Sequence, residues 1–368
     1  MKEVIIVAPM EANGRYRGGI MSVANTLFDN REQFLKYDIE LRKFNTYIRN
    51  RKAETIGKLD LDNILNMFCI IKGLLKVTKK NGCDTLYYNS SIKSALLKDL
   101  LIIRILRLFG RKQKIVLHIH FAELDKILPN NTLIRKWMLR TLENKVDKII
   151  YLSTETKKEF EIAGISFEKG VVIYNFHNGR IEEPAVLEKQ KECLKKKQLD
   201  YIFMGSIEHR KGILDLLEAM KKCTQYAKLH ICGSCSDETV KEKYKHLINE
   251  LGNCVVDHGF VTGSEKDQLM RQADCLVLPS YGEGFPLVLV DAMAYGCSCI
   301  TTPVGAVPEF FSEKNGYIFD AGNIEILSGC IASAASSRVL TAEQMYTNYV
   351  DSKKFSLECF IESLQKVL

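Results

Sequence analysis

The sequence predicts an α/β protein with two open parallel sheets in tandem. Short β-branched runs alternate with longer stretches of helical spacing, which is typical of parallel strands joined by crossover helices. The alternation stops near the middle of the chain and then restarts. The length of 368 residues fits two domains of roughly 150 to 200 residues each. We therefore expect two Rossmann-like domains, each with its own sheet and core.

The expected strands follow from the β-branched runs. In the first half they are VIIVA (4–8), DTLYY (84–88), KIVLHIH (114–120), DKIIYL (147–152) and VVIY (171–174). In the second half they are YIFMG (201–205), KLHICG (228–233), NCVVDHG (253–259), DCLVLP (274–279) and SCITT (298–302). The charged stretch from about Asn175 to Gln198 is the expected linker. We place the domains at 1–178 and 179–350, and a C-terminal helix at 351–368 that can cross back to the first domain.

Composition indicates a folded cytoplasmic protein. The chain is 46% hydrophobic and 26% charged and has seven prolines, without a low-complexity tract. Its first apolar run is shorter than the apolar core of a signal peptide. Twelve cysteines without an export signal favour a reducing compartment. Cys232 and Cys235 have CxxC spacing, but zinc would require a second pair at comparable spacing, so we expect packing roles.

Positive charge is concentrated in the first half. Residues 1–178 hold 31 Lys and Arg against 19 Asp and Glu, whereas the remainder holds 21 against 26. This asymmetry favours an anionic partner, although lysines that merely solvate helix faces explain it equally well. Nucleic acid is not expected, because no recognised module or aromatic stacking pattern is present. The apolar and basic segment 91–112 can lie on an anionic membrane; the alternative is a buried crossover helix.

Ligands of open α/β sheets bind at the carboxyl ends of the strands, here in a cleft between the domains. Gly18 and Gly19 lie between the first strand and a helix, where backbone amides can approach an anion. A plain turn is the alternative. Arg210 and Lys211 precede a second helix and can bind a diphosphate, or they form a solvated basic turn.

Two histidines end the strand expected over 114–120. His118 and His120 lie on the same side of that strand, and His120 is nearer its end. A histidine at this position can donate a hydrogen bond or transfer a proton. A buried structural histidine is the alternative. No third ligand is placed for a metal.

The stretch EGFPLVLVDAMAYG (283–296) holds two carboxylates. Pro286 suits a first helical position, so the helix is expected from Pro286 to Tyr295, with Gly296 ending it. Glu283 then precedes the helix and Asp291 lies inside it, roughly 12 Å further along. Carboxylates so separated are suited to bind two ends of an extended ligand through its hydroxyls.

Together these residues resemble the retaining glycosyltransferases of the GT-B fold, specifically family 4, a group that includes bacterial polysaccharide-type group 1 enzymes. The resemblance covers nearly the whole chain. It rests on the glycine loop, the mid-domain histidine, Asn175, the segment 205–212, PSYGEGFPLVLVDAMAYG (279–296), and TPVGAVPEFF (302–311) followed by NG. It implies two Rossmann-like domains that face each other across a cleft.

The resemblance also implies roles for single residues. Glu283 matches the first acid of the family's E-x7-E motif, which contacts the donor sugar, and Asp291 matches the second, which holds the ribose. Lys211 matches the diphosphate-binding lysine, Gly18 and Gly19 the loop that closes over the diphosphate, and His120 the histidine near the anomeric carbon. The backbone around Gly284, Phe285, Leu287 and Val288 would serve the sugar and diphosphate. Such enzymes resemble one another in needing neither metal nor cofactor.

Two departures from the family pattern concern the donor. Ser206 replaces a usual arginine, whose phosphate contact Arg210 would have to supply, and Asp291 is one methylene shorter than glutamate.

The implied activity is that of a retaining hexosyltransferase. It would move a sugar from a nucleotide diphosphate sugar, most commonly a UDP-sugar, to a glycan or lipid-linked hydroxyl in cell-surface polysaccharide synthesis. The enzyme would act in the cytoplasm or on the inner face of the membrane. The alternatives are a non-catalytic nucleotide-sugar-binding protein and a GT-B epimerase or phosphorylase.

Overall fold

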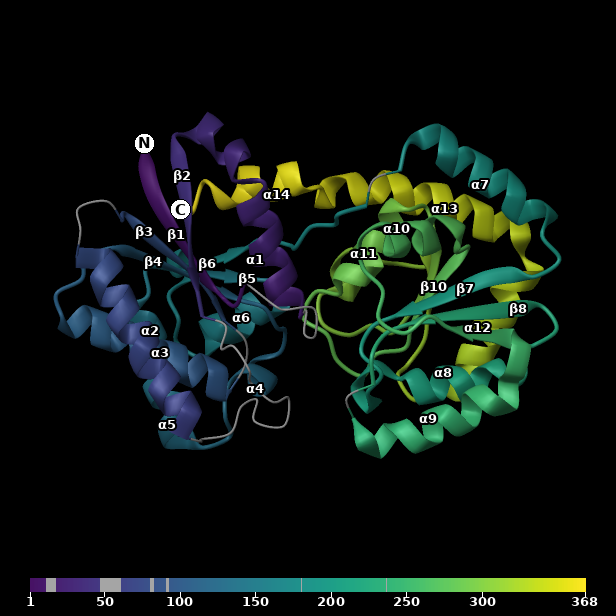
Figure 1. The fold of residues 1–368 in the computed structure, drawn as a ribbon, viewed down its shortest axis with the longest axis horizontal. Helices are drawn as coiled ribbons and strands as arrows, with labels where there is room; N and C mark the ends of the chain where they lie inside the picture. The colour runs from purple at the N-terminus through teal and green to yellow at the C-terminus, as the bar shows by residue number, and fades with distance from the viewer. Residues whose placement is uncertain (11–17, 47–60, 80–82, 91–92, 180, 236) are drawn as a thin grey trace. The chain divides into compact units, whose positions relative to one another are not determined.

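The structure is a computed structural model that describes residues 1–10, 18–46, 61–79, 83–90, 93–179, 181–235 and 237–368. The chain forms two compact units, Met1–Asn175 with Glu358–Leu368, and Phe176–Leu357 (Figure 1). Each unit contains a six-stranded sheet in which every strand pair is parallel. The expected two-domain α/β fold is confirmed.

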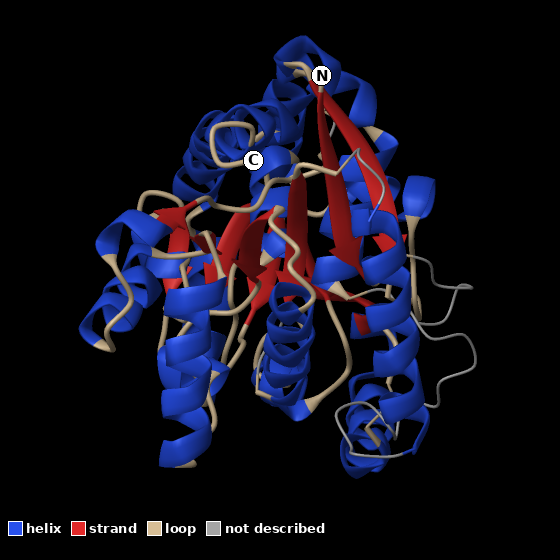
Figure 2. Cartoon of the chain, turned by 90° about the vertical axis from the view of Figure 1, so that its left-hand side faces the viewer, coloured by secondary structure: helices blue, strands red, loops and turns tan. Residues whose placement is uncertain are grey.

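The sheet of the first unit has the strand order β2-β1-β3-β4-β5-β6, and Figure 2 shows its strands with helices around them. The strands are β1 Lys2–Ala8, β2 Ile39–Asn45, β3 Thr85–Ser90, β4 Lys114–Ile119, β5 Lys148–Tyr151 and β6 Gly170–Val172. The α-helices are α1 Gly19–Asp29, α2 Leu61–Lys79, α3 Ser94–Leu108, α4 Leu124–Ile127, α5 Thr132–Lys145 and α6 Thr154–Ile162. Helix α14, Leu357–Leu364, carries the chain end back to this unit.

The sheet of the second unit has the order β12-β11-β10-β7-β8-β9. Its strands are β7 Leu199–Met204, β8 Ala227–Cys232, β9 Val255–Asp257, β10 Cys275–Leu278, β11 Ser298–Thr301 and β12 Gly316–Ile318. The α-helices are α7 Glu183–Lys195, α8 Ile213–Met220, α9 Glu238–Leu251, α10 Gly263–Gln272, α11 Leu287–Ala294, α12 Ile324–Ser336 and α13 Arg338–Ser352. Most strands therefore lie where the β-branched runs predict them.

Two strands were not predicted, and both lie at a sheet edge. Strand β2 pairs with β1 alone, and its Arg42 and Lys43 are exposed. Strand β12 pairs with β11 over three residues. An edge strand is covered less than a central one, so its sequence does not show a continuous apolar run.

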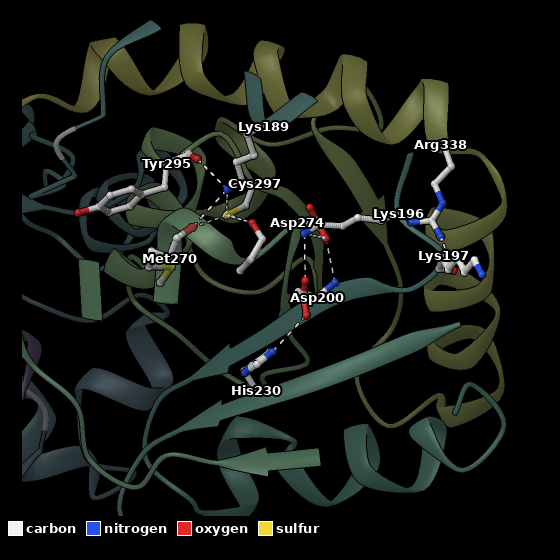
Figure 3. A network of polar contacts seen from close by, with 11 residues as sticks. Lys189, Lys196, Lys197, Asp200, His230, Met270, Asp274, Tyr295, Cys297 and Arg338 are labelled. Carbon is white, nitrogen blue, oxygen red and sulfur yellow. Dashed lines mark hydrogen bonds and ion pairs between the residues drawn. The ribbon is translucent and has the colours of Figure 1, made fainter. Parts of the chain in front are cut away.

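The expected linker at 175–198 begins where the first unit passes into the second, but most of it is helix α7. Pro184 lies in the first turn of this helix, and Val186 and Cys193 are buried on one face. Lys189 is buried on the same face, and its ammonium donates to the carbonyls of Met270 at 3.2 Å and Tyr295 at 2.9 Å (Figure 3). The charged residues of this run conceal the apolar positions that attach the helix to the second unit.

The described part of the predicted membrane segment 91–112 is crossover helix α3. It packs on α2, α5 and β3, and its Leu100, Ile103 and Leu106 are fully buried. The structure thus favours the crossover alternative. Among the described residues, no helix is both long enough and apolar enough to cross a membrane.

Candidate functional site

Two loops meet at the carboxyl edge of the second sheet. One follows β7 and contains Lys211, and the other follows β10 and contains Glu283. Because β7 and β10 are neighbours in the sheet, their carboxyl ends bring the loops together. The ammonium of Lys211 lies 2.5 Å from Oε1 of Glu283. Two candidate residues 72 positions apart in sequence therefore form one ion pair.

Glu283 is held almost out of solvent, with 9% of its side chain exposed. The hydroxyl of Ser280 also donates to its Oε1 at 2.7 Å. Arg210 donates to the carbonyl of Gly282 at 2.6 Å, and its Nη1 lies 3.8 Å from Oε2 of Glu283. Oε1 thus accepts two short hydrogen bonds, whereas Oε2 faces a cation at longer range. Ser280 was not predicted, although it lies inside the quoted motif.

Two glycines fix the loop that carries Glu283. Gly212 has φ +68°, and a Cβ there would lie 2.0 Å from the carbonyl oxygen of Pro279. Gly305 has φ +60°, and a Cβ there would lie 2.4 Å from the carbonyl oxygen of Glu283. Only glycine combines this backbone conformation with such close approach. The segment 279–286 is therefore held between the loops that contain Gly212 and Gly305.

Helix α11 begins and ends one residue inside its predicted bounds. Pro286 is its N-cap, and Gly296, with φ +61°, follows the C-cap Tyr295 and ends the helix as expected. Leu287 and Val288 lie in the first turn, where backbone N–H groups have no acceptor within the helix. The side chain of Phe285 packs among Phe310 and Phe355, with ring centroids 5.1 and 5.6 Å away. Leu287 and Val288, whose backbone groups are expected to contact the donor, are thus at the start of this helix.

Asp291 lies on α11 and is 5% exposed. Its Oδ1 accepts the backbone N–H of Asn178 at 2.9 Å, and its Oδ2 lies 2.6 Å from the ammonium of Lys266 on α10. Neither Asn178 nor Lys266 was predicted as a site residue. A cation four residues into a helix has no distinctive sequence signal, so only the fold reveals this pairing.

In the first unit, His118 lies near the end of β4 and His120 directly follows the strand. The imidazole of His118 is fully buried and lies 2.6 Å from the Tyr87 hydroxyl. Nε2 of His120 lies 2.8 Å from Oδ1 of Asn89, and the two histidine rings are 3.9 Å apart. Burial lowers the pKa of His120 to about 3 and lowers that of His118 well below its usual value. Both rings are therefore neutral near pH 7, with His118 in the predicted alternative role of a buried structural histidine.

Gly18 is the N-cap of α1 and Gly19 is its first residue. A Cβ on Gly18 would meet no atom within 4 Å, so packing does not require glycine there. The rest of the predicted loop, residues 11–17, lies outside the described residues. In the described part of the chain, His, Cys, Asp and Glu side chains form no group of three that could bind a metal.

Residues 187–350 match the family described as glycosyl transferases group 1. This part of the chain is therefore similar to the domain of group 1 glycosyltransferases. The domain lies within the second unit and includes the Lys211–Glu283 pair and Asp291.

Relatives by sequence extend beyond the glycosyltransferase domain. An uncharacterized 41.2 kDa protein from the cps region of Klebsiella pneumoniae is 25% identical over 305 residues, 81% of each chain. The lipopolysaccharide 1,6-galactosyltransferase of Salmonella typhimurium is 27% identical over 206 residues, 54% of each chain.

Solved structures resemble the whole chain. Anabaena HepE in complex with UDP has a TM-score of 0.71 and 17% identity, covering 100% of this chain and 99% of that one. Sucrose-phosphate synthase from Thermosynechococcus elongatus has a TM-score of 0.76 and 16% identity, covering 100% and 98%. At such identity the likeness shows the fold alone, which is that of the GT-B glycosyltransferases.

Proposed function

We propose that this protein is a retaining family 4 glycosyltransferase that moves a sugar from a UDP-sugar to a hydroxyl of a glycan or lipid-linked acceptor. The observation that carries the proposal is the Lys211–Glu283 pair at the carboxyl edge of the second sheet. This pair lies inside the matched glycosyltransferase domain. Its position is where ligands of open α/β sheets bind.

Glu283 and Lys211 bind different parts of the nucleotide sugar: the carboxylate binds the sugar and the ammonium binds the diphosphate. Oε2 of Glu283 accepts a hydroxyl of the donor sugar, because Oε1 is already bound by Lys211 and Ser280. The Lys211 ammonium, with Arg210 nearby, neutralises charge that grows on the diphosphate as the glycosidic bond breaks. The first-turn amides of α11 add favourable partial positive charge. These groups neutralise the charge that a metal ion would otherwise neutralise, so the transfer is metal-independent.

Retention is proposed through attack on the same face of the donor sugar. Glu283 precedes helix α11 and Asp291 lies inside it, and each carboxylate is paired with its own lysine, Lys211 or Lys266. The two carboxylates are therefore not arranged as the acid and nucleophile pair of a glycoside hydrolase. The leaving phosphate instead takes the proton of the acceptor hydroxyl. His120 is neutral near pH 7 because burial lowers its pKa to about 3, and its one N–H is directed at Oδ1 of Asn89. Its Nδ1 therefore accepts a hydrogen bond from a hydroxyl near the anomeric carbon.

The donor and acceptor are proposed from the relatives. HepE has been solved with UDP and with UDP-glucose, which supports a UDP-sugar donor. The Salmonella relative acts on lipopolysaccharide and the Klebsiella relative comes from a cps region. These names support a role in cell-surface polysaccharide synthesis, with catalysis on the cytoplasmic side of the membrane.

The test is nucleoside diphosphate release by the purified protein over a panel of nucleotide sugars, with Glu283→Ala alongside. We expect one UDP-sugar to be turned over, faster with acceptor and unchanged by EDTA, and the variant to lose this activity. NMR of the product must show the anomeric configuration of the donor. Binding without turnover would favour the non-catalytic alternative. Turnover that no acceptor accelerates would favour an epimerase, and phosphate-dependent turnover would favour a phosphorylase.

We further propose peripheral contact with an anionic membrane through the outer face of α2, defined as Leu65, Phe68, Lys72 and Lys76. Leu65 and Phe68 are each 60% exposed, and both lysines are exposed further along the same helix. Apolar side chains followed by cations suit the boundary between acyl chains and anionic headgroups.

Vesicle sedimentation at low salt tests this face. Wild type should bind phosphatidylglycerol vesicles, and Leu65→Ser with Phe68→Ser should not. Val339→Ser, which removes a 65% exposed side chain from the other unit, is the control and should bind normally. Equal binding to neutral vesicles, or none to anionic ones, contradicts the proposal.

A further inference from the structure

The carboxylate of Asp291 is covered by the ammonium of Lys266. Oδ2 of Asp291 lies 2.6 Å from Nζ of Lys266, and Oδ1 accepts the backbone N–H of Asn178. The Asp291 side chain is 7% exposed, whereas that of Lys266 is 28% exposed. A ligand that arrives from solvent therefore meets the lysine ammonium before it meets the carboxylate.

This arrangement changes the hydrogen-bonding character of the position. A lone carboxylate only accepts hydrogen bonds, but an ammonium has three N–H donors. Within the described residues, the structure gives Lys266 a single acceptor, Oδ2 of Asp291. The paired position can thus donate to a ligand oxygen through Lys266 and accept from its hydroxyl through Asp291. A ribose hydroxyl, which both donates and accepts, matches this pair.

We propose that Lys266 is a specificity-determining residue that binds the nucleotide ribose together with Asp291. This inference rests on the proposed function and concerns the ribose of the same donor. Aspartate is one methylene shorter than glutamate, and Lys266 extends the reach of the shorter side chain by placing its donors on the solvent side. The site then recognises the 2′- and 3′-hydroxyls through an ion pair and not through a carboxylate alone.

A purely structural role for the ion pair has a different consequence. The Tyr295 hydroxyl already donates to Oδ1 of Asp267 at 2.6 Å, so α10 and α11 are joined by a second contact. If Lys266 only joined these helices, its replacement would lower the stability of the protein. It would also weaken the binding of all nucleotides by the same factor. Dependence on the ribose hydroxyls separates the two explanations.

The experiment is calorimetric titration of the full chain with UDP and with 2′,3′-dideoxy-UDP. Wild type should bind UDP at least tenfold more tightly than the dideoxy analogue. Lys266→Met should weaken UDP binding about tenfold and leave binding of the analogue unchanged. Asp291→Glu in the Lys266→Met background should restore UDP binding in part. Lys245→Met, at an exposed lysine of α9, is the control and should match wild type.

Each outcome decides between the explanations. Equal losses for both nucleotides in Lys266→Met, or no loss for either, overturn the inference while UDP binding by wild type leaves the proposed function standing. Failure of wild type to bind any nucleoside diphosphate overturns both. Should Lys266→Met not fold, Lys266→Arg keeps the charge, and its loss of affinity must again be confined to UDP.

Discussion

The Lys211 ammonium and the Glu283 carboxylate form a 2.5 Å ion pair although they come from loops that follow two different strands. Lys211 is 15% exposed and Glu283 is 9% exposed at the side chain. A pair so shielded is sensitive to loss of either partner, because the remaining charge has few alternatives for solvation. The pair therefore couples the geometry of the carboxylate proposed to bind the sugar to that of the cation proposed to bind the diphosphate.

Glu283→Gln should lower sugar transfer about a hundredfold or more, as expected when a preorganised charged contact is lost. Lys211→Met should have a similar effect. Because the two residues act as a unit, the double variant should lose much less than the product of the single losses. Turnover of the nucleotide sugar by all three variants measures this. Multiplicative losses would show that the two residues act independently.

Ser280→Ala should slow transfer by about tenfold and also lower the free energy of unfolding, because a buried carboxylate loses one donor. The Ser280 hydroxyl donates to Oε1 of Glu283 at 2.7 Å, and a hydrogen bond to a charged group contributes about 1.5 to 3 kcal/mol. The loss should fall on kcat more than on the dissociation constant of the nucleoside diphosphate, since Ser280 orients the sugar-binding carboxylate. An unchanged kcat would show that Ser280 has no role in the site.

Gly212→Ala should lower the free energy of unfolding by about 2 kcal/mol or more and disrupt the site. The added Cβ would lie 2.0 Å from the Pro279 carbonyl oxygen, at a φ of +68°, so both crowding and backbone strain oppose it. Gly329→Ala is the matched control. Gly329 lies inside helix α12 and a Cβ there meets nothing within 4 Å, so alanine should stabilise by up to about 1 kcal/mol. Chemical denaturation of both variants checks the difference.

Stability should fall as pH drops from 6.5 toward 3, in part because of His120. Burial lowers its folded-state pKa to about 3, below the ordinary value near 6.5. The unfolded chain therefore binds more protons in this window, and acidification favours unfolding by about 1.4 kcal/mol per pH unit. Urea denaturation of wild type and His120→Gln from pH 7 to 5 isolates this contribution. The exposed His246→Gln variant should follow wild type, and a His120→Gln slope equal to wild type would contradict the prediction.

Local sequence patterns predicted much of the fold and part of the site. The helix expected at 286–295 forms at Leu287–Ala294, because proline, an apolar run and a terminal glycine act within one stretch of chain. Strand β4, which His120 follows, forms where the β-branched run predicts it. By contrast, the edge strands β2 and β12 and helix α7 were missed, because partial exposure and charged residues obscure their apolar positions.

The sequence by itself determined the two-sheet α/β architecture and the presence of Glu283, Asp291 and Lys211 at loop and helix positions. These properties depend on short-range periodicity and turn chemistry, which a single segment contains. Only the tertiary structure decided that Lys211 contacts Glu283 and that Lys266 contacts Asp291. The first pairing arises because parallel strands place the ends of distant segments at one edge of a sheet. The second joins helices α10 and α11, and the spacing of residues along the chain specifies neither pairing.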